Sequence, residues 1–221
     1  MAYLCSSNSR NGFVRGVYLL LSMQFTIIML SSLFALLNRD LRNSLQNNIE
    51  VFVMMSVSLL IMVAIGACFS LHRQTPWNAS MLGVFTAGYC LLMATVSAAS
   101  ESYGAVFVFG TLAIICLLIT LVSCVENWNP LSWVSIFILL LLVLAFYIVA
   151  FGFVRESPEI TSVSFALSLV VTFYLLIDTS SVMTRPNLQL ESDEVVFAVL
   201  TLHLDGLIII SKEVATKCYC I

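Results

Sequence analysis

Charged residues are scarce in this chain. They make up 10% of its 221 residues, whereas an ordinary soluble domain carries about 25%. Hydrophobic residues make up 61%, and the mean hydropathy is +1.05. So few charges cannot cover a folded surface that faces water, which excludes a soluble protein and predicts an integral membrane protein in a lipid bilayer. The net charge of −3 is small and indicates no nucleic-acid partner.

Motifs for metal or disulfide chemistry are absent as well. The seven cysteines show neither the spacing of a zinc site nor that of a disulfide framework. Most of them lie within apolar runs, where a thiol behaves as a small hydrophobe. No nucleophile–base pair is visible either. We therefore expect neither an enzyme nor a bound cofactor.

Apolar runs long enough to cross a bilayer occur along the whole chain. A helix needs about 20 apolar residues to cross the hydrocarbon layer. The segments between the runs are short and polar, so no soluble domain is expected. The sequence predicts an all-α membrane protein whose single domain, residues 1–221, is a seven-transmembrane-helix bundle. The seven runs are 16–37, 51–71, 79–99, 104–124, 131–152, 160–183 and 194–212.

The distribution of lysine and arginine bears on the orientation of the bundle. With seven full spans, four of these residues lie on the amino-terminal side and five on the other, which decides nothing. If the last run instead re-enters the membrane and returns, Lys212 and Lys217 change sides. The count then becomes six against three and favours a cytosolic amino terminus.

Two carboxylates lie inside apolar runs, Asp178 in FYLLIDTSSVM and Asp205 in VLTLHLDGLIII. A charged side chain at the bilayer centre costs about 2.5–3.5 kcal/mol on insertion scales. We therefore expect the two aspartates to face each other in the bundle interior, where they can share a proton or a cation and titrate as a coupled pair. The alternative is that each one hydrogen-bonds a neighbouring helix or lies among headgroups at the end of its span.

Helical spacing places polar residues on one face of both runs that carry these aspartates. In the last run these are Glu194, Thr201, Asp205 and Lys212, and in the preceding run Ser164, Ser168, Thr172 and Asp178 or Thr179. His203 is two residues from Asp205 and points elsewhere, so we expect a packed or capped histidine, with a ligand role as the alternative. Small residues on one face of the third run predict close helix packing: Gly83, Ala87, Cys90, Ala94 and Ala98.

Four segments are similar to signatures of the transmembrane Bax inhibitor motif family. FVRGVYLLLSMQF (13–25) resembles its Arg-x-Val-Tyr-x-x-Leu-x-x-Gln at the first span, and TPWNASMLGVFT (75–86) its Pro-x-Asn…Leu…Phe-Thr at the third. YLLIDTSSVM (174–183) resembles the Tyr-Asp-Thr segment of the sixth span. SDEVVFAVLTLHLDGLIII (192–210) resembles the Glu-Tyr-x-x-Ala…Leu-x-Leu-Asp-x-x-Asn signature of the seventh. The resemblance covers nearly the whole chain.

The resemblance implies a seven-helix bundle that forms a pH-sensitive Ca²⁺ leak and suppresses cell death. It also implies intracellular membranes, either endoplasmic reticulum, Golgi or endolysosomal. In relatives, a sixth-span and a seventh-span aspartate form the pH-sensing pair that gates the pore. These positions match Asp178 and Asp205, which would bind protons and the passing Ca²⁺ ion.

The resemblance also assigns supporting roles. The acidic residue that opens the family's last span matches Asp193 or Glu194. The basic latch on the second span has its counterpart in Arg73 or His72. Thr179 and Thr201 share the polar stripes with the aspartates and would support the pore face.

The chain departs from the family pattern at several positions, as a divergent and even a viral member would. Ile177, Val195 and Ile208 replace a Tyr, a Tyr and an Asn of the family signatures, and the acidic residue of the third span is replaced near Tyr89. These departures leave open a non-conducting membrane scaffold that binds host membrane proteins or apoptosis-regulating proteins. A seven-helix receptor is a third reading, which the short loops and termini disfavour.

Overall fold

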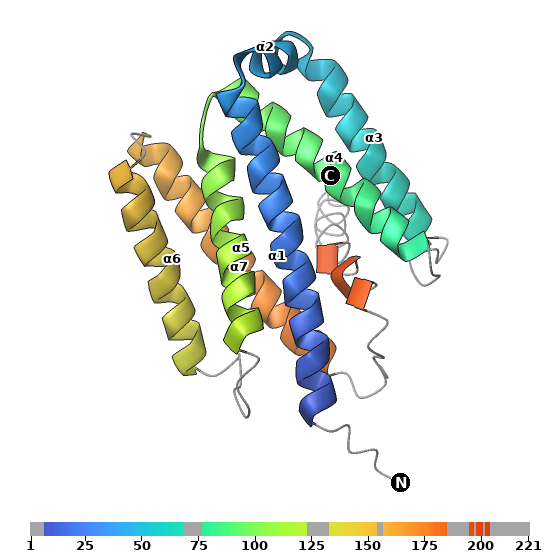
Figure 1. Cartoon of the computed structure of the whole chain (residues 1–221), viewed down its shortest axis with the longest axis vertical. Coiled ribbons are helices and arrows are strands. Elements are labelled where there is room, and N and C mark those ends of the chain that lie inside the picture. Colours follow the sequence, from blue (N-terminus) through green and yellow to red (C-terminus); the bar gives the residue numbers. More distant parts are fainter. Residues whose placement is uncertain are drawn as a thin grey trace, which may run out of the picture.

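The computed structural model describes residues 7–68, 77–122, 133–153, 157–184, 195–196, 198–200 and 202–203. Within these ranges every regular element is α-helical, which confirms the predicted all-α class. The helices are α1 (Ser7–Leu37), α2 (Arg39–Asn47), α3 (Ile49–Cys68), α4 (Trp77–Ser100), α5 (Gly104–Val122), α6 (Trp133–Phe153) and α7 (Pro158–Thr184), as Figure 1 shows.

Five of these helices are long and apolar enough to cross a membrane, counted over the described residues. They lie in α1, α3, α4, α5 and α7 and coincide with five of the expected runs. α6 has 21 residues and covers the run 131–152, but its apolar stretch Leu140–Val149 is shorter than the five spanning helices. Of the seventh run, only the short helical pieces between 195 and 203 are described, and 204–212 lie outside. The chain is therefore a multi-pass membrane protein.

The polar segment between the first two runs, expected as a simple break, contains a helix. Asn38 caps α2, because its side-chain oxygen accepts hydrogen bonds from the backbone N–H groups of Asp40 and Leu41 at 3.1 and 3.2 Å. α2 buries Leu45, and Gln46 donates a hydrogen bond to a backbone carbonyl of α4 at 2.8 Å. The break is thus a short amphipathic helix that ties the end of α1 to α4.

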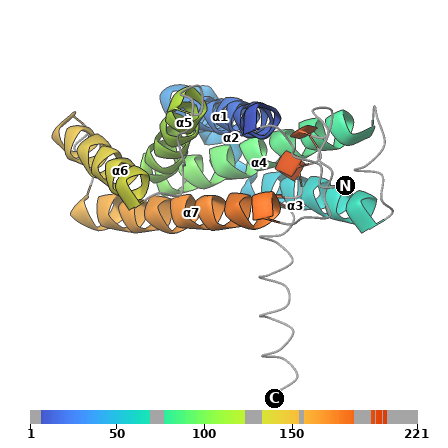
Figure 2. The same ribbon diagram turned by 90° about the horizontal axis from the view of Figure 1, so that it is seen from below.

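α1 and α5 form the centre of the bundle. α1 packs along α5 and α4, α7 packs on α5, and α3 packs almost entirely on α4. Viewed from below in Figure 2, α4 lies between α1 on one side and α3 and α7 on the other. Tyr18, Leu21 and Ile28 of α1 and Leu112 and Ile119 of α5 are at most 2% exposed. These residues form a core that excludes solvent, and the other helices pack around it.

The outer faces of the helices are as apolar as the core. Phe34 of α1, Met54 of α3 and Ile148 of α6 are 60%, 70% and 64% exposed. A soluble protein rarely exposes large contiguous apolar patches. Such faces fit contact with lipid chains, which agrees with the scarcity of charge in the sequence.

Close packing of α4 occurs, but it does not follow the expected stripe of small residues. Ala94 and Ala98 are buried, whereas Gly83 and Ala87 of the same stripe are exposed. The tightest approach is at Gly88, which lies off that stripe and faces α3. The reason is that α3 covers a different side of α4 from the one that α1 and α2 cover.

Gly88→Leu is therefore expected to destabilise the protein. A Cβ at Gly88 would lie 3.1 Å from the Leu59 Cβ and 3.4 Å from the Ser56 carbonyl oxygen, so a larger side chain must push α3 away. Overpacking of this kind costs about 1–3 kcal/mol. Thermal unfolding in detergent measures the effect. The matched control is Gly83→Leu, because a Cβ at Gly83 meets nothing within 4 Å. Equal melting temperatures for the two variants would contradict the α3–α4 packing.

Candidate functional site

Most of the predicted site residues fall outside the part of the chain that the structure describes. Arg73, Asp193, Glu194, Thr201 and Asp205 lie outside the described residues altogether. Asp178 and Thr179 lie within the α7 helix, but their side chains are not among those described. The expected pairing of the two aspartates thus stays a prediction, and the described residues around them define the site.

The predicted polar stripe of α7 faces the interior. Ser164, Ser168 and Thr172 are at most 5% exposed, and Thr161 continues the stripe. The Ser168 and Thr172 hydroxyls donate to the carbonyls of Phe165 and Ser168 at 2.9 and 2.7 Å, so their protons are satisfied within the helix. The sequence expectation of an inward polar face on this helix is confirmed for these hydroxyls.

The described pieces after α7 also enter the core. Ala198, Val199, Leu200 and Leu202 are at most 7% exposed. A Cβ at Gly16 of α1 would lie 2.9 Å from a methyl of Val195, so the glycine makes room for this segment. The last segment, as far as it is described, therefore packs against α1 inside the bundle.

A cavity of about 570 Å³ lies between α4, α5 and α7. Its wall is apolar and aromatic, with Tyr89 from α4, Phe109 from α5 and Tyr174 from α7. Leu202 and His203, the last described residues, complete the wall. The volume falls within the range of about 300–1,000 Å³ that is typical of ligand pockets.

The α7 helix carries one of the two predicted acidic positions close to this cavity. The α7 backbone rises 1.5 Å per residue, so Asp178 lies about 6 Å along the helix from Tyr174. At 3.6 residues per turn, its position falls on the same side of α7 as Val171 and Tyr174, which line the cavity. Asp205 follows His203 by two residues in the sequence and lies outside the described residues. The cavity therefore adjoins the α7 segment that leads to Asp178, and its wall includes His203, two residues before Asp205 in the sequence.

A hydrogen bond joins the two segments at this point. The Tyr174 hydroxyl donates to the Leu202 carbonyl oxygen at 3.4 Å. Tyr174 stands one helical turn before Asp178, and Leu202 stands three residues before Asp205. Sequence reasoning did not single out Tyr174, because an inter-segment bond to a backbone carbonyl leaves no pattern in the sequence.

A buried amide also escaped the sequence analysis. The Gln24 side-chain NH₂ of α1 donates to the Thr86 hydroxyl oxygen of α4 at 2.7 Å. The Thr86 hydroxyl donates its own proton to the Leu82 carbonyl at 2.8 Å, so towards Gln24 it can only accept. This fixes the orientation of the amide and links α1 to α4 in the core. The signal was present only as the Gln that ends the first-span signature.

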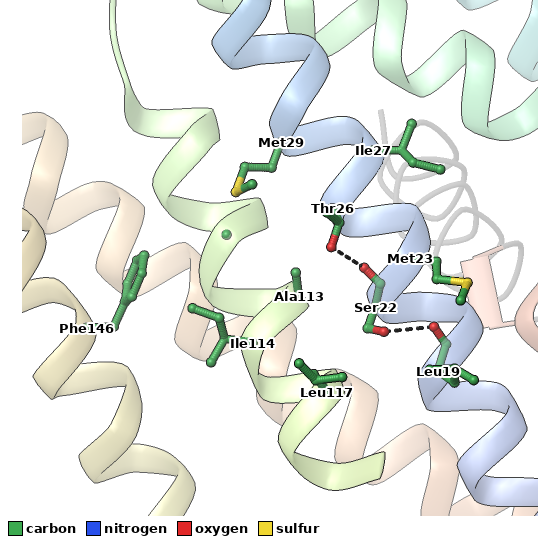
Figure 3. Close-up of a pocket in the computed structure, with 11 residues that line it drawn as sticks. Leu19, Ser22, Met23, Thr26, Ile27, Met29, Ala113, Ile114, Leu117 and Phe146 are labelled. Carbon is green, nitrogen blue, oxygen red and sulfur yellow. Dashed lines mark hydrogen bonds between the residues drawn. The ribbon is translucent and has the colours of Figure 1, made fainter. Parts of the chain in front are cut away.

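A second hollow of about 600 Å³ lies on the outer face between α1, α5 and α6, as Figure 3 shows. Ser22 and Thr26 of α1 line it, and their hydroxyls donate to the Leu19 and Ser22 carbonyls at 2.8 and 2.7 Å. The remaining lining is apolar, including Ala113 of α5 and Phe146 of α6. Its rim is apolar and exposed, with Leu19, Met23 and Ile27 of α1 42%, 53% and 52% exposed, as on the lipid-facing sides of the other helices.

His203 is packed among aromatic rings, as the sequence predicted for it. Its ring centroid is 4.8 Å from that of Phe85 in an edge-to-face arrangement and 6.3 Å from that of Phe25. Groups of three or more histidine, cysteine or acidic side chains that could hold a metal ion do not occur among the described residues. Within those residues, the site is an aromatic cavity whose wall carries the hydroxyls of Ser164, Tyr89 and Tyr174.

Comparison with known proteins gives one match that spans the bundle. A family model described as inhibitor of apoptosis-promoting Bax1 matches residues 10–212. This range contains α2 to α7, most of α1, and the described pieces of the last segment. No solved structure matches the chain.

Proposed function

The chain belongs to the family described as inhibitor of apoptosis-promoting Bax1, and on this premise we propose that it is a pH-sensitive Ca²⁺ leak channel of intracellular membranes. The leak lowers the calcium content of the store and thereby suppresses cell death. The observation that carries the proposal is the aromatic cavity inside a bundle of membrane-spanning helices, with Tyr174 of α7 and His203 of the last segment in its wall. Asp178 and Asp205 follow these two residues by four and two positions in the sequence. No cofactor and no enzymatic step belong to this function.

The chemistry of the two aspartates suits both the ion and the proton. Carboxylate oxygens are preferred ligands of Ca²⁺. Two carboxylates in a low-dielectric bundle cannot both ionise cheaply without a cation, so they share a proton when the pore is closed. Loss of that proton adds repulsion and biases the helices apart, which opens a place for Ca²⁺. Lower pH therefore favours the closed form, and higher pH favours the open form.

The proposal includes a seventh membrane segment. Residues 194–212 form it, and its described part already lies in the core next to α1. The store membrane is that of the endoplasmic reticulum, the Golgi or an endolysosomal compartment. Hydroxyls of the α7 stripe support the pore face, together with Thr179, Thr201 and the acidic residues Asp193 and Glu194. Arg73 supplies the basic latch.

Expression of the protein in cells is expected to lower store calcium. The physical reason is that a leak adds an outward flux that the store pumps must balance. A store-targeted Ca²⁺ indicator measures the steady level, and Asp205→Asn at equal expression is the control that should restore it. An unchanged store with the wild-type protein would refute the leak.

A second candidate function is a membrane scaffold for apoptosis-regulating proteins, and the outer groove favours it. Leu19, Met23 and Ile27 of α1 line this groove and are 42%, 53% and 52% exposed, so an apolar helix of a partner protein could pack on them. The store experiment separates the two candidates. Suppression of cell death with unchanged store calcium supports the scaffold, whereas suppression that is lost with Asp205→Asn supports the leak.

A further inference from the structure

The His203 ring is held on two sides by rings from different helices. The Phe85 ring of α4 meets it edge to face with centroids 4.8 Å apart, and the Phe25 ring of α1 lies 6.3 Å away. These two phenylalanines belong to a larger aromatic group, because Phe85 stacks on Tyr89 and Phe25 lies against Phe109 of α5. The imidazole is thus part of a cluster that spans three helices and the last segment.

The imidazole is also fixed to its own backbone. Its Nδ1 lies 2.8 Å from the Val199 carbonyl oxygen, one turn earlier in the last segment. A carbonyl only accepts hydrogen bonds, so Nδ1 carries the proton and donates it. This bond holds the ring whether or not its second nitrogen is protonated. The orientation of the ring is therefore set relative to the helix that carries it.

The two phenylalanines that hold the ring are themselves braced. Gln24 precedes Phe25 in α1, Thr86 follows Phe85 in α4, and the Gln24 amide donates to the Thr86 hydroxyl at 2.7 Å. Gln24 is 4% exposed, so this hydrogen bond lies in the core. It sets the spacing of α1 and α4 at the level of the aromatic pair. The Gln24–Thr86 hydrogen bond therefore sets the width of the slot between the Phe25 and Phe85 rings, which receives His203.

We propose that His203 is a positioning residue of the leak. Its ring packs between Phe85 and Phe25 and so fixes the position of the last segment along its axis and its rotation about that axis. The place of the Asp205 carboxylate, two residues further on, follows from this. The inference rests on the proposed leak for its consequence on flux, but its structural part stands on the ring contacts alone. His203 acts here through its shape and not by titrating.

Formation of a disulfide in the double variant Gly16→Cys/Val195→Cys reports whether the last segment packs against α1, and it requires no measurement of ion flux. A Cβ at Gly16 would lie 3.7 Å from the Val195 Cβ, which fits the spacing of about 3.5–4.5 Å in disulfides. A protease site inserted in segment 185–192 separates the two halves on a non-reducing gel unless the bridge has formed. We expect the bridge in the otherwise wild-type protein.

Substitutions of His203 in that background test the proposal. His203→Ala is expected to lower the rate of bridge formation about fivefold, which is the scale of a lost aromatic contact. It is also expected to shift the pH profile of Ca²⁺ flux in liposomes. His203→Phe keeps an aromatic ring in the slot and is expected to restore both. Phe34→Ala, a lipid-facing aromatic on α1, is the matched control and should change neither.

The outcomes separate this inference from the proposed function. Normal bridge formation and an unchanged pH profile in His203→Ala would overturn the positioning role. A pH profile abolished in both His203→Ala and His203→Phe would also overturn it, because the imidazole itself would then be required. Reduced bridge formation in His203→Ala that Phe rescues, with no flux in any variant, would support the positioning role and refute the leak.

Discussion

Asp205→Asn is expected to lower the Ca²⁺ flux of the purified protein in liposomes by about tenfold or more. The amide keeps the size of the side chain but removes the negative charge that offsets the desolvation of a divalent ion. Asp205 follows His203, which lines the cavity, so the lost charge lies beside the proposed path. A charge-assisted contact of this kind contributes about 1.5–3 kcal/mol, and a tenfold change in flux corresponds to about 1.4 kcal/mol. Loss of the contact therefore accounts for the expected decrease.

The control for this prediction removes a carboxylate from the membrane surface. Glu159 lies exposed in the first turn of α7, at the far end of that helix from Asp178. Glu159→Gln lowers the net negative charge by the same amount as Asp205→Asn and should leave the flux unchanged. Equal losses in both variants would show that overall charge, and not the position of Asp205 in the chain, controls the flux.

Asp178→Asn is expected to flatten the pH dependence of the leak. In the wild-type protein, the flux should rise by about tenfold or more as the pH increases from 5 to 8, because the deprotonated fraction of a single group grows by up to about tenfold per pH unit below its pKa. The asparagine cannot titrate, although it can still hydrogen-bond its neighbour. Without a shared proton to lose, the remaining carboxylate no longer switches the helices between closed and open. The flux ratio between pH 8 and pH 5 should therefore fall towards one.

This second prediction depends on the two aspartates acting as a pair. The single Asn variants at 178 and 205 and the double variant should all lose the pH response, because either substitution removes the shared proton. A pH profile that is identical in the wild type and in both single variants would remove the pair from the mechanism, even if the flux itself were real. A profile lost only in Asp205→Asn would assign the proton to that residue alone.

The membrane helices were predictable because burial in lipid leaves a strong sequence signal. Runs of about 20 apolar residues are visible without tertiary information, and five of them correspond to spanning helices in the described residues. The polar stripe of α7 was predictable for a related reason, since Ser164, Ser168 and Thr172 recur at the helical period and an inward face is the favourable place for them in lipid.

The helix between the first two runs was missed because its stability is mostly tertiary. α2 has nine residues, which is too short for a stable isolated helix, and it depends on the Asn38 cap and on packing against α4. The tight contact at Gly88 was missed for a similar reason. Small residues mark where a helix can approach, but the partner helix decides which of them it uses.

The candidate site was only partly visible in the sequence. The aspartates stood out because charge is rare in apolar runs, and the packed histidine followed from helical geometry. The Gln24–Thr86 and Tyr174–Leu202 hydrogen bonds join residues 62 and 28 positions apart, so neither has a local pattern. Sequence separation of this size hides an interaction until the helices are placed in space.

The central claim is that the chain itself conducts Ca²⁺, and flux from sealed liposomes tests it most directly. Purified wild-type protein is reconstituted with a trapped Ca²⁺ indicator, and the initial rate of Ca²⁺ entry is compared with that of protein-free liposomes and of liposomes with the Asp178→Asn/Asp205→Asn variant. We predict entry that is well above the protein-free rate, increases from pH 5 to pH 8, and falls to the protein-free rate in the double variant. Wild-type entry equal to that of protein-free liposomes across this pH range, with the protein shown to be folded and inserted, would contradict the claim.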